Sequence, residues 1–210
     1  SGYSSEDLSM KIYLLDKKGK SVAATEFERF LTDEAQSLYM GILSDSYSSL
    51  TFLDMGGDEL YFDGKYYPVK LKEMSPEELT DGLEELNFLV VDRYNTGVLT
   101  KEQLEAIEDW NYDGGMLLVG TGSYAEDVLA GLESQLGVKC RTVYEGNTYD
   151  GDSQEMEMAL ADLVDVNNQY YTSYYSSDMG LCGSMGRGAV MVLPFSLTEL
   201  SYMNEQYFYQ

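Results

Sequence analysis

The segment from residue 86 to 122 constrains the fold of this chain more than any other. It opens with the continuous apolar run 87–92 (NFLVVD), which is typical of a strand buried on both faces of a sheet. A capping box, Thr100 with Gln103, then starts an amphipathic helix, and a double glycine ends it. Residues 116–119 form a second apolar run, followed by a glycine turn. Strand, helix and strand in this order predict one unit of a parallel α/β sheet.

The rest of the chain gives weaker signals of the same kinds. An Asp-Gly pair between β-rich runs predicts a hairpin excursion near residues 58–72. Caps and apolar spacing predict helices over 25–43, 75–86, 123–136, 156–166 and 197–209, and further strands over 50–53, 138–144 and 188–195.

Alternating strands and helices of this length predict an α/β fold, a three-layer sandwich with a mainly parallel central sheet. No repeat or linker interrupts the chain, so we expect a single domain over residues 1–210, with residues 1–10 as a flexible N-terminal segment.

In parallel sheets, ligands bind beyond the carboxyl ends of the strands, at the point where strand order reverses. Two loops of this chain follow such strand ends. They supply the candidate ligand-binding residues Asp92, Arg93, Tyr94, Asn95, Thr121, Gly122 and Ser123. The turn at 120–123 also places backbone N–H groups before a predicted helix, which favours an anion. A purely structural turn is the alternative.

The charge of the chain excludes several partners. Its 37 acidic and 13 basic residues give a net charge of -24, which opposes nucleic acid and anionic membrane surfaces. No apolar run is long enough to insert into a membrane. The chain opens with a polar stretch that has no signal region, so we expect an extracytoplasmic segment whose targeting sequence lies elsewhere.

Catalytic and metal-binding signals are weak. The chain contains no histidine. Residues 109–114 match the first half of a calcium loop, but Gly120 occupies the twelfth position, where a bidentate Glu is needed. We therefore interpret this stretch as a helix end and predict no metal and no cofactor. Cys140 and Cys182 form either one disulfide or a free buried pair.

The central segment resembles class I glutamine-amidotransferase-like domains of exported bacterial proteins. The shared pattern is a strand ending in Asp, then L-x-x-x-Q-x-x-A-I/L-x-x-W, then G-G-x-L-x-V-G-x-G. The matching residues are Asp92, Leu99, Gln103, Ala106, Ile107, Trp110, Gly114, Gly115, Leu117, Val119, Gly120 and Gly122. Residues 186–195 are similar to the closing G-x-G-x-V-x-x-L-x-F of that family. The resemblance implies a flavodoxin-like sandwich.

The amidotransferase chemistry does not follow from the resemblance. Active members place a Cys in the turn after a central strand and complete a triad with His and Glu, whereas this turn offers Thr121 and Ser123. We therefore expect no catalytic residue, and a non-catalytic domain that binds an unknown small molecule, glycan or protein within a larger envelope protein. The alternative is a carboxylate-dependent hydrolase of glycans or amides that uses the same strand ends.

Overall fold

The computed structural model describes residues 8–15, 21–29, 37–57, 59–62, 65–149, 155–168, 171–172 and 180–200. The chain divides into two compact units, Ser1–Gln36 and Ser37–Gln210. A single domain over residues 1–210 therefore stays a prediction.

The first unit is a two-stranded antiparallel hairpin of β1 (Leu8–Leu15) and β2 (Ser21–Arg29). Thr25 lies opposite Ile12 across this hairpin, so the helix predicted over 25–43 is wrong. Pairing with a neighbouring strand has overridden a local capping pattern. Of the predicted flexible segment, residues 8–10 belong to β1, and residues 1–7 lie outside the described residues.

The second unit is built on an eight-stranded sheet whose order is β10-β11-β12-β7-β6-β3-β5-β4 among the described residues. Strands β5, β3, β6, β7 and β12 run parallel to one another, and β4, β11 and β10 join antiparallel at the edges. The strands are β3 (Leu38–Leu43), β4 (Glu59–Phe62), β5 (Lys65–Glu73), β6 (Phe88–Asp92), β7 (Met116–Gly120), β10 (Tyr171–Thr172), β11 (Leu181–Met185) and β12 (Gly188–Leu193).

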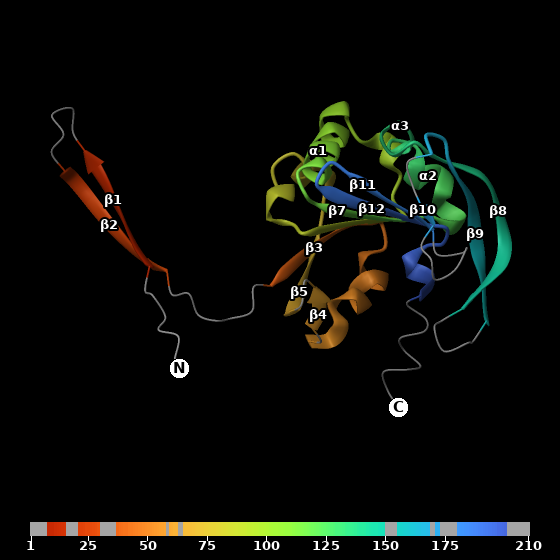
Figure 1. Cartoon of the computed structure of the whole chain (residues 1–210), viewed down its shortest axis with the longest axis horizontal. Coiled ribbons are helices and arrows are strands. Elements are labelled where there is room, and N and C mark those ends of the chain that lie inside the picture. The colour runs from red at the N-terminus through yellow and green to blue at the C-terminus, as the bar shows by residue number, and fades with distance from the viewer. Residues whose placement is uncertain are drawn as a thin grey trace. The chain divides into compact units, whose positions relative to one another are not determined.

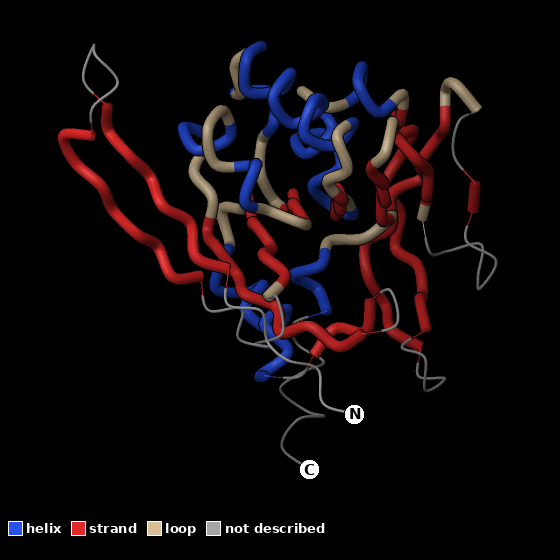
Figure 2. Tube along the Cα trace, turned by 60° about the vertical axis from the view of Figure 1, so that its left-hand side comes forward, coloured by secondary structure: helices blue, strands red, loops and turns tan. Residues whose placement is uncertain are grey.

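Helices cover both faces of this sheet, as Figures 1 and 2 show. On one face lie α1 (Lys101–Tyr112), α2 (Ala125–Leu129) and α3 (Glu133–Leu136). On the other face lie the 3-10 segments η1 (Tyr47–Gly57) and η6 (Leu197–Leu200), orange and blue in Figure 1. The fold is therefore the predicted three-layer, flavodoxin-like α/β sandwich, and β4 with β5 forms the predicted hairpin.

Each face of the sheet has its own hydrophobic core, because side chains alternate between the faces along each strand. Leu89 and Val91 of β6 pack in the larger cluster, under α1 and α2. Val90 between them packs in the smaller cluster, with Leu50 of η1 and Leu197 of η6. This alternation explains why the run 87–92 reads as apolar throughout.

One strand prediction and one further helix prediction are also wrong. Residues 50–53 lie in η1 instead of a strand. Residues 156–165 lie in β9 (Glu155–Asp165), which pairs antiparallel with β8 (Val138–Tyr149) in a sheet of their own. Their sequence also alternates polar and apolar residues, so a strand partner decides between helix and strand. Of the helix predicted at 197–209, residues 197–200 form η6, and the remainder lies outside the described residues.

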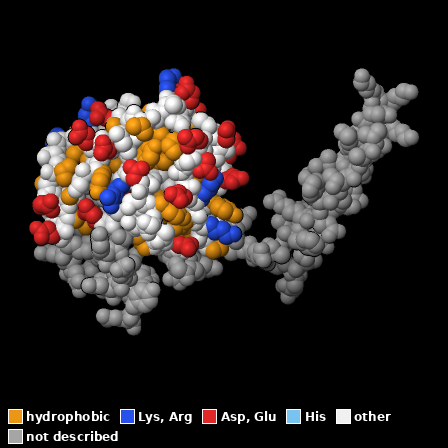
Figure 3. Space-filling model, turned by 180° about the vertical axis from the view of Figure 1, so that it is seen from behind, with side chains coloured by type: hydrophobic (Ala, Val, Ile, Leu, Met, Phe, Trp, Pro, Cys, Tyr) orange, Lys and Arg blue, Asp and Glu red, His pale blue; other side chains and the backbone are white. Residues whose placement is uncertain are grey.

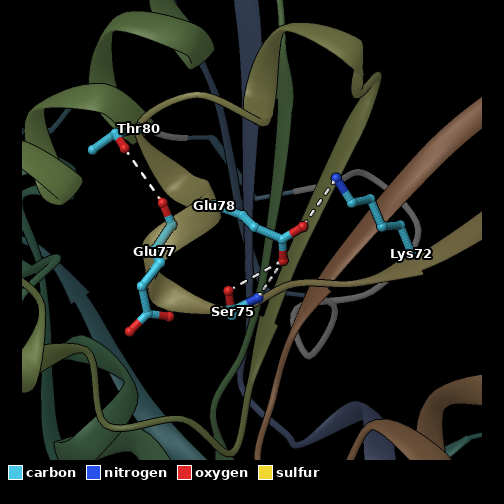
Figure 4. A network of polar contacts seen from close by, with 5 residues as sticks. All are labelled: Lys72, Ser75, Glu77, Glu78 and Thr80. Carbon is cyan, nitrogen blue, oxygen red and sulfur yellow. Dashed lines mark hydrogen bonds and ion pairs between the residues drawn. The ribbon is translucent and has the colours of Figure 1, made fainter.

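The helix predicted over 75–86 is replaced by two short turns, η2 (Pro76–Leu79) and η3 (Leu83–Glu85). Its predicted start is correct, as Figure 4 shows. The Glu78 carboxylate accepts hydrogen bonds from the Ser75 amide at 2.9 Å and the Ser75 hydroxyl at 3.2 Å. Lys72 of β5 pairs with the other carboxylate oxygen at 3.3 Å. These contacts lower the pKa of Glu78, the Ser75 amide bond contributing most.

The double glycine after α1 allows the indole of Trp110 to lie close against the backbone. The Trp110 ring lies against Gly115, where an added Cβ would clash with ring atom Cε2. The indole N–H donates to the backbone oxygen of Leu86 at 3.3 Å. The helix ends at Tyr112, with Asp113 as its C-cap, so the interpretation of residues 109–114 as a helix end is confirmed. A larger residue at 115 would displace the indole.

Candidate functional site

The strand order reverses between β3 and β6. The connection that leaves β3 runs through η1 toward β5, whereas the connection that leaves β6 runs through α1 toward β7, on the other side of the sheet order. The loops that follow β3 and β6 therefore leave the carboxyl end of the sheet in opposite directions, which is the geometry that creates a ligand crevice in open α/β sheets. A hydrogen bond of 3.3 Å from the Asp45 amide to the Arg93 oxygen joins the loops there.

A pocket of about 210 Å³ opens at this position, and we call it the switch-point pocket. All of its lining residues are polar or charged, and they are Asp45, Ser46, Arg93, Asn95, Tyr124 and Asp127. The volume lies below the ~300–1,000 Å³ of drug-sized ligand sites, so it fits a small polar ligand or one side chain of a partner.

Arg93 has an unusual backbone conformation in this pocket. Its φ of 49° lies in the left-handed region, which is uncommon for a residue other than glycine. Its guanidinium lies over the ring of Tyr124, 4.5 Å from the ring centroid. This cation–π contact holds the positive charge beside the pocket. Strain of this kind clusters at functional sites, so Arg93 marks the pocket as a candidate site.

Asp92, one position earlier, is buried and bonded into the fold. Its carboxylate accepts from the Ser196 hydroxyl at 2.8 Å and from the Leu197 amide at 2.6 Å. Burial raises the pKa of Asp92, and these two hydrogen bonds partly oppose that shift. Gly120 on the neighbouring strand leaves room for the carboxylate, since an added Cβ would clash with its Oδ2. The acid thus fastens the C-terminal η6 turn to the sheet.

The glycine turn after β7 is engaged by the chain itself. The Thr121 amide donates to the Phe195 oxygen at 2.9 Å, and the Gly122 amide donates to the Pro194 oxygen at 3.2 Å. The Thr121 hydroxyl donates to the Leu193 oxygen at 2.5 Å. The family that this chain resembles has its nucleophile in the corresponding turn. In this chain the turn instead forms hydrogen bonds that join β7 to the end of β12.

The other predicted site residues lie in different surroundings. Asn95 lines the switch-point pocket and accepts from the Gly97 amide at 2.9 Å, as the N-cap of η4 (Thr96–Val98). Tyr94 packs against the larger core cluster, and its pKa is raised by burial and then by Asp45. Ser123 lies within η5 (Gly122–Tyr124) instead of capping a long helix, and it lines a separate pocket of about 410 Å³.

A second acid, Glu199, lies near Asp92. Its Oε2 is buried without a hydrogen-bond partner among the described residues. Burial raises the pKa of Glu199, and the charges of Asp92 and Glu145 raise it further. Neither the apolar pattern nor the motifs of the sequence point to Glu199. Only the contact between η6 and β6 in the fold places this residue near the site.

Sequence reasoning therefore found Arg93 and Asn95 and missed the rest of the switch-point pocket. Asp45 and Ser46 follow β3, which the sequence analysis assigned to a helix. Tyr124 and Asp127 did carry a signal, since Tyr124 directly follows the predicted loop and Asp127 lies three positions later, on the same face of the predicted helix.

No metal-binding group and no membrane span emerge from the described ranges. Within them, no three His, Cys, Asp or Glu side chains gather closely enough to hold a metal ion. None of the described helices is both long and apolar enough to cross a membrane. Cys140 on β8 and Cys182 on β11 are not joined by a disulfide.

Comparisons with known proteins give a fold and no family. No protein-family model and no curated protein matches the chain. An exo-β-1,4-mannosidase, Op5Man5, from Opitutaceae bacterium strain TAV5 matches 81% of this chain with 34% of its own, at 10% identity and a TM-score of 0.52. A GH42 β-galactosidase, Gan42B, from G. stearothermophilus matches 83% of this chain with 30% of its own, at 11% identity and a TM-score of 0.50. The chain thus spans about a third of the length of these enzymes, and the likeness is one of fold.

Proposed function

We propose that the second unit is a non-catalytic binding domain on an amidotransferase-like scaffold, which takes a small ligand or a partner's side chain into the switch-point pocket. One observation carries this proposal. The pocket lies where strand order reverses and is lined by charged and polar side chains, with a strained arginine held over a tyrosine ring.

The motif residues support the amidotransferase-like scaffold. Trp110 depends on Gly115 for its position, and Asp92 depends on Gly120 for its room. All four residues belong to the pattern that this chain shares with that family, and they act in pairs across the β6-α1-β7 unit. The pattern is therefore explained as packing, which a scaffold keeps when its chemistry is lost.

The groups available at the strand ends favour binding over catalysis. Without histidine, neither a serine nor a cysteine of this chain has an imidazole base. The Thr121 hydroxyl is bonded to a backbone oxygen, and Ser123 lines a different pocket from Arg93. The polar groups that face the switch-point pocket suit hydrogen bonding and charge recognition.

An extracytoplasmic location, within a larger envelope protein, belongs to the same proposal. It is supported by the net charge of -24 and by the resemblance to domains of exported proteins. Figure 3 shows acidic side chains spread over one face, with fewer basic ones between them. Fractionation of the native host tests it, since an intact cytoplasmic pool without an exported one would contradict it.

The binding proposal is tested by nuclear magnetic resonance of the full chain labelled with ¹⁵N. Galactose, mannose and glutamine serve as probes, together with a library of small polar fragments. We expect a subset to shift the amide signals of Ser46, Asn95 and Asp127, and Arg93→Ala to abolish those shifts. Arg187→Ala is the matched control, because that arginine is exposed and pairs with Asp113. Shifts that survive in Arg93→Ala, or that cluster elsewhere, would refute the site.

A carboxylate-dependent hydrolase remains the second candidate, because one observation favours it. Asp92 is buried and Glu199 is half-buried, the pKa values of both are raised by burial, and the charge of Asp92 raises the pKa of Glu199 further. Surroundings that raise the pKa of a carboxyl group favour general acid catalysis by that group. Against this stand the hydrogen bonds of Asp92 to Ser196 and Leu197, which occupy its oxygens within the fold.

A further inference from the structure

A third pocket, larger than the two described above, lies where the parallel strands of the sheet begin, and we call it the amino-edge pocket. It encloses about 630 Å³ beside the first residues of three parallel strands, Leu38, Phe88 and Met116. Among the lining residues, Phe88 and Met116 are half-buried apolar side chains, whereas Leu79 and Leu83, from the turns η2 and η3, are buried in the larger core. None of these residues belongs to the switch-point pocket, so the two sites are independent.

The C-terminal half of α1 also lines the pocket, and it carries Trp110 in a fixed position. Its ring is fixed against Gly115, and its N–H is bonded to the Leu86 oxygen at 3.3 Å. The residue is only partly buried and lines the pocket. A partly exposed tryptophan whose position is already fixed is the kind of anchor that dominates the energy of protein interfaces.

The rim of the pocket is acidic. Glu84, Asp109 and Asp113 all line it and are exposed. No lysine or arginine is among the described residues that line it. Arg187 pairs with Asp113 at 3.0 Å, so the net negative charge of the rim comes from Glu84 and Asp109.

We propose that the amino-edge pocket binds a peptide segment of a partner protein in which apolar residues are flanked by lysine or arginine. The apolar side chains would pack against the partly exposed Trp110, Phe88 and Met116. The flanking cations would face Glu84 and Asp109. The net charge of -24 draws a cationic segment toward this chain and opposes acidic ligands and a second copy of the same chain.

Trp110 gives a direct measurement, because it is the one tryptophan of the sequence. The full chain is titrated with the end-blocked hexapeptide Lys-Lys-Leu-Phe-Lys-Lys while tryptophan emission is recorded. We expect a saturable change that weakens as salt is added. The peptides Glu-Glu-Leu-Phe-Glu-Glu and Lys-Lys-Ser-Ser-Lys-Lys separate the two requirements, and neither should saturate. No saturation with the first peptide, or an equal response to either control peptide, would overturn the proposal.

Charge-neutralising variants then locate the binding. Asp109→Asn should weaken the peptide about two- to five-fold, the effect of one partly screened charge, and Glu84→Gln should do the same. Glu108→Gln is the matched control, since this exposed acid is adjacent on α1 and does not line the pocket. Equal affinity for all three variants and the wild type would refute the assignment. A shift in emission with protein concentration alone would assign the surface to a second copy of the chain and also overturn the proposal.

Discussion

The carboxylate of Asp92 accepts a hydrogen bond of 2.6 Å from the backbone amide of Leu197. Because these residues lie 105 positions apart, the bond fastens the C-terminal η6 turn to the end of the central strand β6. Asp92, the first residue of the shared motif, therefore has a structural role, and this role is enough to explain its presence without any chemistry.

Replacement of Asp92 should separate its hydrogen bonds from its charge. Asp92→Ala leaves the Leu197 amide and the Ser196 hydroxyl without this partner and should lower the free energy of unfolding by about 2–3 kcal/mol. Asp92→Asn can still accept from the amide, with its NH₂ group donating to the Ser196 oxygen, and should cost about 1 kcal/mol or less. Urea unfolding of the three proteins measures both values. Equal losses for Ala and Asn would show that the charge itself is required.

The contact between Trp110 and Gly115 should appear as an energetic coupling. Gly115→Ala places a methyl group into the indole and should destabilise the fold by about 1–3 kcal/mol. In a Trp110→Leu background the same glycine change should cost at least about 1 kcal/mol less, because the clash is gone. A double-mutant cycle of unfolding free energies measures this. Additive effects would contradict the packing described for the motif.

The half-buried acid Glu199 should make the fold less stable as pH rises. Its pKa is raised in the folded state, so between the unfolded value near 4.5 and the folded value the native protein binds more protons. Stability therefore falls through that window, and the cost is fully present above it. Glu199→Gln should exceed the wild type in thermal midpoint at about pH 7 and match it at about pH 4. A variant less stable than the wild type at neutral pH would contradict this account.

Glu78 should show the opposite dependence. Its pKa is lowered from 4.5 by the Ser75 amide and by Lys72, so its contribution is present above the unfolded value and is lost as pH falls through the folded value. Glu78→Gln keeps the capping geometry and removes the charge. Acid titrations of stability should thus be flatter for this variant than for the wild type. Glu77→Gln, on the same turn, serves as the control, and a curve identical to that of Glu78→Gln would refute the assignment.

The central β6-α1-β7 unit could be predicted because its signals are local. The capping box of Thr100 and Gln103 forms as expected, with 3.3 Å from the Gln103 amide to the Thr100 hydroxyl. The switch from a continuous apolar run to helical spacing marks where each element begins. The hairpin of β4 and β5 could be predicted for the same reason, since an Asp-Gly pair between two β-rich runs is a strong local signal for a hairpin turn.

The failures share a physical cause, which is that strand pairing is not local. Residues 38–43 and 156–165 fit a helical spacing and a strand alternation equally well, and only their partners decide. The wrong prediction for residues 38–43 also hid two residues of the switch-point pocket. With β3 taken as a helix, Asp45 and Ser46 had no reason to lie at the same edge as Arg93.

Turnover assays test the central claim most directly. The wild type and Asp92→Asn are compared on p-nitrophenyl β-galactoside, on p-nitrophenyl β-mannoside and for ammonia release from glutamine. Asp92→Asn is the right comparison because we expect it to fold while lacking the carboxylate. A binding domain predicts that neither protein exceeds the buffer rate on any substrate. Turnover by the wild type that is lost in folded Asp92→Asn would contradict the account and establish the hydrolase instead.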